Sequence, residues 1–172
     1  MLLRFAAENI MSFKNAVEFN TFPSSKSHSH EWHKMDCGYV TALRMSAIYG
    51  ANGAGKSNLL KCIALLKSLV GAEKMGEADI AEDLYFKLDE NGKNTPSELA
   101  VEFFTEGKIF YYHLRFNRQE VFEEELLLSQ KTKDIRIFSR KDNDINVSGD
   151  YLRPGGKDDF IEVFMNAMNR IV

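Results

Sequence analysis

Hydrophobic and polar residues alternate with a period of two over much of the second half of the chain. Leu99, Val101 and Phe103 alternate with the residues between them, and the pattern returns after a Glu106-Gly107 turn. This period is typical of strands, because successive side chains of a strand point to opposite faces of a sheet. Further short strands are predicted over 121–128, 135–139 and 145–147. Together they predict an antiparallel meander over residues 99–150.

The first half of the chain mixes strand and helix periods. Strands are predicted over Leu2–Ile10 and Ala16–Phe19, joined as a hairpin, and the apolar run of residues 43–49 predicts a buried strand. From Lys56 onward the period is helical, and Gly71 ends the pattern where a left-handed C-cap favours glycine. The apolar positions of this predicted helix recur at spacings of three and four: Leu59, Leu60, Ile63, Leu66 and Val70.

Between the predicted strand and the predicted helix lies a motif with a specific chemistry. Residues 50–57 (GANGAGKS) match G-x-x-x-x-G-K-[ST], which we call the P-loop. Glycines let the backbone N–H groups approach phosphate oxygens, and the following helix directs its positive end toward the same oxygens. The Lys56 ammonium would reach the β and γ phosphates, and the Ser57 hydroxyl would bind Mg²⁺. The motif therefore predicts ATP and Mg²⁺ as ligands.

Composition supports a single globular lobe. The 172 residues are 44% hydrophobic and 27% charged, with a net charge of -3, which gives no support to nucleic-acid binding by this chain alone. Two cysteines in no metal-binding spacing favour a reducing, cytoplasmic setting, and no apolar run is long enough to span a membrane.

We divide the expected lobe, residues 1–172, into four parts. They are residues 1–72 with the first strands, the P-loop and the first helix, an acidic, partly helical excursion at 73–98, the meander at 99–150, and a terminal amphipathic helix at 157–172.

Other candidate sites are weaker. His28, His30 and His33 with Glu31 could bind zinc, but a polar loop is the better interpretation. The aromatic run 109–116 suggests a platform for nucleobases, and a sheet covered on both faces is preferred. The segment 86–90 (FKLDE) is the best literal match to an acidic Walker B strand, and we reject it because a lysine and an Asn-Gly turn interrupt it.

Three stretches together resemble the N-terminal part of ABC-class, SMC-like ATPases of the AAA-family ATP-binding proteins, a group that includes the OLD-type nucleases. They are LLRFAAENIMSFKNAVEFN, AIYGANGAGKSNLLKCI, and the run from LYFKLDENGKNTPSELAVEFF to FSRK. The resemblance implies an α/β P-loop NTPase fold, an ABC-ATPase-like lobe with a mixed sheet and a flanking antiparallel β-meander. It implies nucleotide contacts along the P-loop and, by position, at two residues of the N-terminal turn: Gly50, Asn52, Gly53, Ala54, Gly55, Lys56, Ser57 and Asn58, with Ser12 and Lys14.

The resemblance also implies parts that this chain does not display. The family's signature loop, Walker B strand and switch histidine are not recognisable, and Gln119 and Gln130 are only candidates for its Q-loop glutamine. We therefore expect an incomplete ATPase domain, whose complete protein hydrolyses ATP. Its expected partners are a second head in a head-to-head homodimer, or the missing C-terminal half, and an effector such as a nuclease. Binding of nucleic acid is expected only for the complete assembly, and no association with a membrane is expected.

Two other functions remain open at this point. The chain could be a non-hydrolysing interaction module that retains a P-loop, as the missing Walker B strand suggests. It could also be a small-molecule kinase, although such kinases usually follow the P-loop with parallel β/α units rather than an antiparallel meander.

Overall fold

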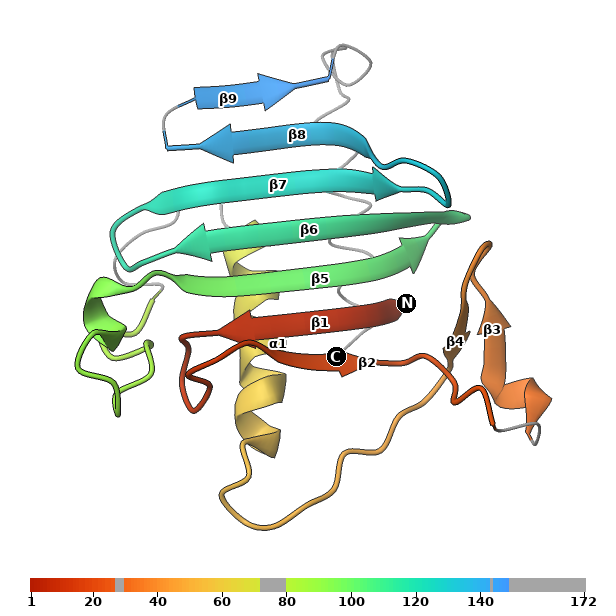
Figure 1. The fold of residues 1–172 in the computed structure, drawn as a ribbon, viewed down its shortest axis with the longest axis horizontal. Coiled ribbons are helices and arrows are strands. Elements are labelled where there is room, and N and C mark those ends of the chain that lie inside the picture. The colour runs from red at the N-terminus through yellow and green to blue at the C-terminus, as the bar shows by residue number, and fades with distance from the viewer. Residues whose placement is uncertain (27–29, 72–79, 143, 149–172) are drawn as a thin grey trace.

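A seven-stranded antiparallel sheet forms the main body of the structure (Figure 1). The structure is a computed structural model that describes residues 1–26, 30–71, 80–142 and 144–148. The sheet order is β2-β1-β5-β6-β7-β8-β9, and every pairing among these strands is antiparallel. The strands are β1 (Leu2–Glu8), β2 (Val17–Asn20), β5 (Ser97–Thr105), β6 (Lys108–Phe116), β7 (Val121–Ser129), β8 (Ile135–Lys141) and β9 (Asp144–Val147).

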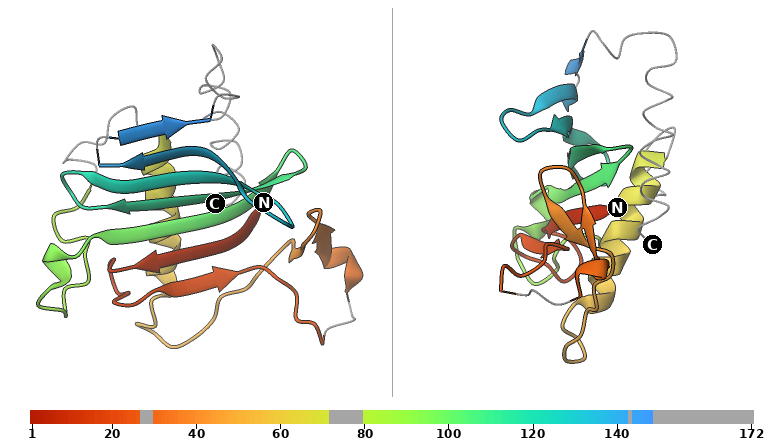
Figure 2. Two further views of the ribbon diagram at one scale, coloured as in Figure 1. Left: turned by 45° about the horizontal axis from the view of Figure 1, so that its top comes forward. Right: turned by 90° about the vertical axis from the view of Figure 1, so that its right-hand side faces the viewer.

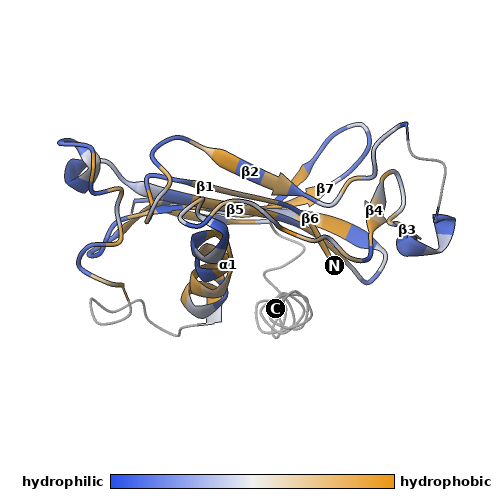
Figure 3. Ribbon diagram, turned by 90° about the horizontal axis from the view of Figure 1, so that it is seen from below, coloured by the Kyte–Doolittle hydropathy of each residue, from blue (hydrophilic) through white to orange (hydrophobic). Residues whose placement is uncertain are grey.

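Among the described residues one long helix, α1 (Lys56–Gly71), crosses one face of this sheet (Figures 1 and 2). Its buried side chains are Leu59, Cys62, Ile63, Leu66 and Leu69. They share one apolar core with the alternate residues of β1, β5 and β6, among which Phe5, Phe103 and Phe116 are fully buried. Figure 3 shows α1 lying beneath the sheet, against this apolar face. Burial of these side chains is the main stabilising contribution to the fold.

The opposite face of the sheet carries charged side chains. The guanidinium group of Arg4 lies 3.7 Å from the carboxylate of Glu18 and 3.5 Å from that of Glu102. The guanidinium group of Arg115 lies 3.2 Å from the carboxylate of Glu98. The same face holds further close pairs, namely His113–Glu98, Arg115–Glu123, Arg136–Glu125 and Lys141–Glu123. A sheet covered on both faces was expected, and on most of this face acidic and basic residues fill the alternate positions.

A small hairpin covers one corner of this charged face. It consists of β3 (Lys34–Asp36) and β4 (Thr41–Leu43), preceded by the 3₁₀ turn η1 (Glu31–His33). The register of β1 against β5 shifts between Leu2 and Arg4, and Leu3 joins a second apolar cluster with Cys37, Ala42 and Ile109. A bulge of this kind turns a side chain to the other face, which gives the hairpin an apolar contact on the sheet.

The predicted strand before the P-loop is wrong beyond Leu43. Residues 44–50 have no regular structure, and Met45 and Tyr49 are 71% and 92% exposed. A buried strand needs a neighbour to satisfy its backbone groups, and no described strand pairs with this segment. For the same reason the expected mixed sheet is not found among the described residues, whose sheet is antiparallel throughout.

The other elements predicted from the sequence are the N-terminal hairpin, the meander, the acidic excursion and the terminal helix. The N-terminal hairpin and all five strands of the meander are confirmed, with β5 starting at Ser97. In the acidic excursion, residues 80–96 form turns and the short 3₁₀ turn η2 (Gly92–Asn94), and Ile80 and Leu84 anchor it in the core. The predicted terminal helix at 157–172 lies outside the described residues.

Candidate nucleotide-binding site

The P-loop forms the end of the long connection between β4 and α1 (Figure 1). Gly53 and Gly55 have φ values of 80° and 86°, which only glycine adopts without strain. The loop turns through these two residues and enters α1 at Lys56, where the Leu59 amide donates to the Gly55 carbonyl at 3.0 Å. The first amides of the helix therefore lie beside an exposed loop, an arrangement suited to an anion.

The Lys56 side chain folds back over this loop. Its Nζ donates to the carbonyl oxygens of Gly50 and Ala51 at 2.8 and 2.7 Å. A cation held by two loop carbonyls is a preformed positive centre that a phosphate oxygen can approach. The predicted ligands Asn52, Gly53 and Ala54 are exposed along the same loop. Ser57 is exposed in the first turn of α1, as a hydroxyl ligand of Mg²⁺ would need to be.

The turn between β1 and β2 packs against the P-loop. The Asn58 side-chain amide donates to Ser12 Oγ at 3.0 Å. A Cβ atom placed on Gly55 would lie 3.0 Å from the Phe13 ring and 3.2 Å from Ser12 Oγ. The structure thus brings Ser12 beside Asn58, 46 positions away in the sequence, and beside the P-loop that precedes Asn58. Phe13 was not among the predicted site residues, although it lies within the quoted N-terminal motif.

Lys14, the other residue predicted from that motif, makes a different contact. Its ammonium lies 2.8 Å from the carboxylate of Asp89. This ammonium holds the pKa of Asp89 below its usual range, chiefly through the hydrogen bond between them. A nucleotide role for Lys14 stays a prediction. Asp89, which belongs to the rejected Walker B match, lies in a loop, and its neighbour Leu88 is 89% exposed.

The turn is fixed to the rest of the molecule by Asn9. Its side-chain amide is buried and reaches the segment 86–95, donating to the carbonyls of Gly92 and Thr95 at 2.9 and 2.6 Å. No role was predicted for this residue, although it lies in the N-terminal stretch that carries the resemblance, because its distant partners are not visible in the sequence.

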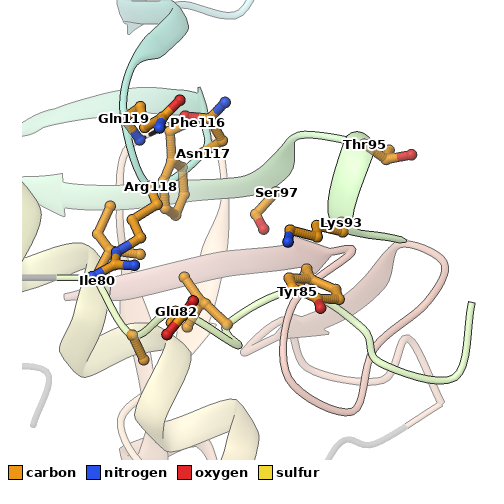
Figure 4. A pocket seen from close by; sticks show the side chains of 12 residues that line it. Ile80, Glu82, Tyr85, Lys93, Thr95, Ser97, Phe116, Asn117, Arg118 and Gln119 are labelled. Atoms are coloured by element: carbon orange, nitrogen blue, oxygen red, sulfur yellow. Dashed lines mark hydrogen bonds between the residues drawn. The ribbon is translucent and has the colours of Figure 1, made fainter. Parts of the chain in front are cut away.

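A separate pocket of about 300 Å³ lies between residues 80–97 and the β6–β7 turn (Figure 4). Gln119 lines it together with Lys93 and Arg118, and no P-loop residue does. Gln130 is exposed after β7, where its backbone amide donates to Asp134. Neither glutamine therefore has a described contact with the P-loop that would support a Q-loop role.

The rings of the histidine segment lie close together. The rings of Trp32 and His33 are tilted by 31° with their centroids 3.6 Å apart, and His30 packs edge-on against Trp32. Within the described residues no group of three His, Cys, Asp or Glu side chains could hold a metal ion. His28 lies outside the described residues. The described part of the segment therefore gives no support to a zinc site. No helix in that part is long and apolar enough to cross a membrane.

A comparison with known protein families finds a match over most of the chain. Residues 45–167 match the model of a family described as "AAA domain, putative AbiEii toxin, Type IV TA system". The match covers more than half of the chain, and it includes the P-loop, α1 and the strands β5 to β9. No curated protein matches the chain significantly.

Proposed function

Because the chain belongs to this family of AAA domains, we propose that its P-loop binds Mg-ATP. The observation that carries the proposal is the loop itself. Two glycines with positive φ turn the backbone, and Lys56 stands over it on the carbonyls of Gly50 and Ala51.

The residues present fit the ligand. The backbone amides of residues 53–57 and the Lys56 ammonium would hold the phosphates, and the Ser57 hydroxyl would hold Mg²⁺. Lys56 would exchange two carbonyl contacts for charge-assisted contacts to phosphate, which are stronger than hydrogen bonds between neutral groups. Bound Mg²⁺ would neutralise part of the phosphate charge.

We further propose that the chain is one lobe of an ABC-type, SMC-like head, completed by a C-terminal half or a second head. A groove of about 540 Å³ between the segment 43–48 and α1 supports this, since it is lined by Met45, Ile48 and Leu60. These three apolar side chains are 71%, 41% and 59% exposed. In the complete assembly, ATP binding and hydrolysis would regulate an effector, with a DNA nuclease as one candidate.

One observation favours the second candidate function, a non-hydrolysing interaction module. Each described strand pairing is antiparallel, whereas the acidic residue that positions water in P-loop ATPases stands at the end of a buried strand beside the P-loop. A module that binds nucleotide without hydrolysing it, and acts through its surfaces, fits this observation.

Thermal unfolding and phosphate release test both functions. Saturating Mg-ATP at about a hundred times its Kd should add about 2.7 kcal/mol to the free energy of unfolding of the wild-type chain. Lys56→Ala should abolish the gain, and Lys61→Ala, on the exposed side of α1, should retain it. Steady phosphate release that is lost in Lys56→Ala would favour hydrolysis by this chain. Stabilisation without release would favour the non-hydrolysing module or a lobe that needs its partner.

A further inference from the structure

Asn9 combines an unusual backbone with a buried polar side chain. It follows β1 with a φ of 45°, in the left-handed region that asparagine adopts more readily than most residues. Only 5% of the residue is exposed. A buried amide is costly unless its donors and acceptor are used, so its partners indicate what the residue does.

All of the side-chain partners of Asn9 lie in one distant segment, residues 84–97, which we call the clamped loop. The amide nitrogen donates to the carbonyls of Gly92 and Thr95, and the amide oxygen accepts from the Phe86 backbone at 3.3 Å. The backbone carbonyl of Asn9 accepts from the buried hydroxyl of Ser97 at 2.7 Å. One residue therefore holds both ends and the middle of this loop.

The clamped loop also contacts the rest of the turn formed by residues 9–14. The Met11 amide donates to the Leu84 carbonyl at 2.6 Å, and Lys14 pairs with Asp89. Gly92 fits only because it has no side chain, since a Cβ there would lie 2.3 Å from the Phe86 carbonyl oxygen. The turn and the clamped loop are thus packed as one unit.

The other side of the turn faces the P-loop. Ser12 accepts from Asn58, and Ser12 and Phe13 occupy the space beside Gly55. No described side-chain contact joins Asn9 itself to residues 50–58. Any influence of Asn9 on the nucleotide site must therefore pass through the turn.

We propose that Asn9 is a positioning residue of the nucleotide site, which clamps residues 84–97 onto the turn and so holds Ser12 and Phe13 against Gly55 and Asn58. The effect on nucleotide affinity rests on the proposed function. The effect on the P-loop backbone does not, and it can be measured without nucleotide.

Asn9→Gly is the appropriate variant, because glycine keeps the positive φ and removes only the side-chain hydrogen bonds. Hydrogen exchange of the full chain without nucleotide should show faster exchange at residues 10–14 and 54–59, with β6 and β7 unchanged. Unchanged exchange at 54–59 would overturn the proposal. If Asn9→Gly does not fold, Ser12→Ala tests the same link, and unchanged exchange at 54–59 in that variant overturns it equally.

The affinity for Mg-ATP distinguishes a positioning role of Asn9 from a purely structural one. Ile137→Ala in β8 serves as the control, because it removes a buried side chain from a strand that pairs with β7 and β9, and with neither strand that flanks the turn. Asn9→Gly removes the side-chain hydrogen bonds that hold the turn. We expect this loss to weaken Mg-ATP binding about three- to tenfold. Ile137→Ala, measured where both variants are fully folded, should leave Kd unchanged.

Equal Kd values in Asn9→Gly and the wild type would show that Asn9 is structural only. If the wild type binds no Mg-ATP, the proposed function fails, and the exchange experiment still decides whether Asn9 positions the P-loop.

Discussion

At the scale of single residues, the surroundings of two glycines in the P-loop differ although their backbones are alike. Both have positive φ, so any other residue would be strained at either position. A Cβ on Gly53 would meet no atom within 4 Å, whereas one on Gly55 would press on Phe13 and Ser12. Gly55 is therefore required twice, by its conformation and by the turn packed against it.

Alanine at these two positions should separate the two requirements. Gly53→Ala should lower the free energy of unfolding by about 1 kcal/mol, from backbone strain alone. Gly55→Ala should cost about 1–3 kcal/mol more, because the Phe13 turn must move. Urea denaturation of both variants measures the difference, and equal losses would contradict the observed contact.

Both thiols are expected to be inert in the folded chain. Cys37 and Cys62 are 1% and 0% exposed, and burial raises the pKa of Cys62 to about 11. With that pKa, about one Cys62 in a thousand is a thiolate at pH 8, and the thiolate is the reactive form. Ellman's reagent at pH 8 should titrate neither thiol until denaturant is added. Rapid titration of either thiol in the native chain would contradict this packing.

At the scale of secondary structure elements, local signals decided which predictions succeeded. The strands β5 to β9 follow from alternation and from turns such as Glu106-Gly107, where both residues have positive φ. The strand expected at 43–49 depends on neighbours that its own residues do not encode, and it is not formed. Leu60 matches the helical period and yet is 59% exposed, because α1 buries the side that includes Cys62 and Leu69 instead.

The orientation of α1 can be tested with two leucines of the same helix. Leu66→Ala should lower the free energy of unfolding by about 2–5 kcal/mol, because Leu66 is fully buried against the sheet. Leu60→Ala should change it by less than about 1 kcal/mol, since the side chain already faces outward and alanine favours helix. A larger loss at Leu60 than at Leu66 would show that the helix is rotated from the described position.

At the scale of the whole molecule, the site joins segments that the sequence separates widely. The P-loop motif can be recognised from the sequence alone, and the nucleotide contacts expected along it stay a prediction. The support beneath the motif cannot be recognised in this way, because Asn9, Phe13 and Asp89 acquire their roles only when the sheet brings residues 9–14 beside residues 50–58 and 84–97. The groove between the segment 43–48 and α1 likewise becomes visible only in three dimensions.

The central claim, that this P-loop holds Mg-ATP through Lys56, is tested most directly by isothermal titration calorimetry. Mg-ATP should bind the wild-type chain at a single site and should bind the Lys61→Ala variant with the same affinity. Lys56→Ala should bind at least tenfold more weakly, because a charge-assisted contact to phosphate contributes about 1.5–3 kcal/mol. Equal binding by Lys56→Ala and the wild type, with both chains folded, would contradict the claim.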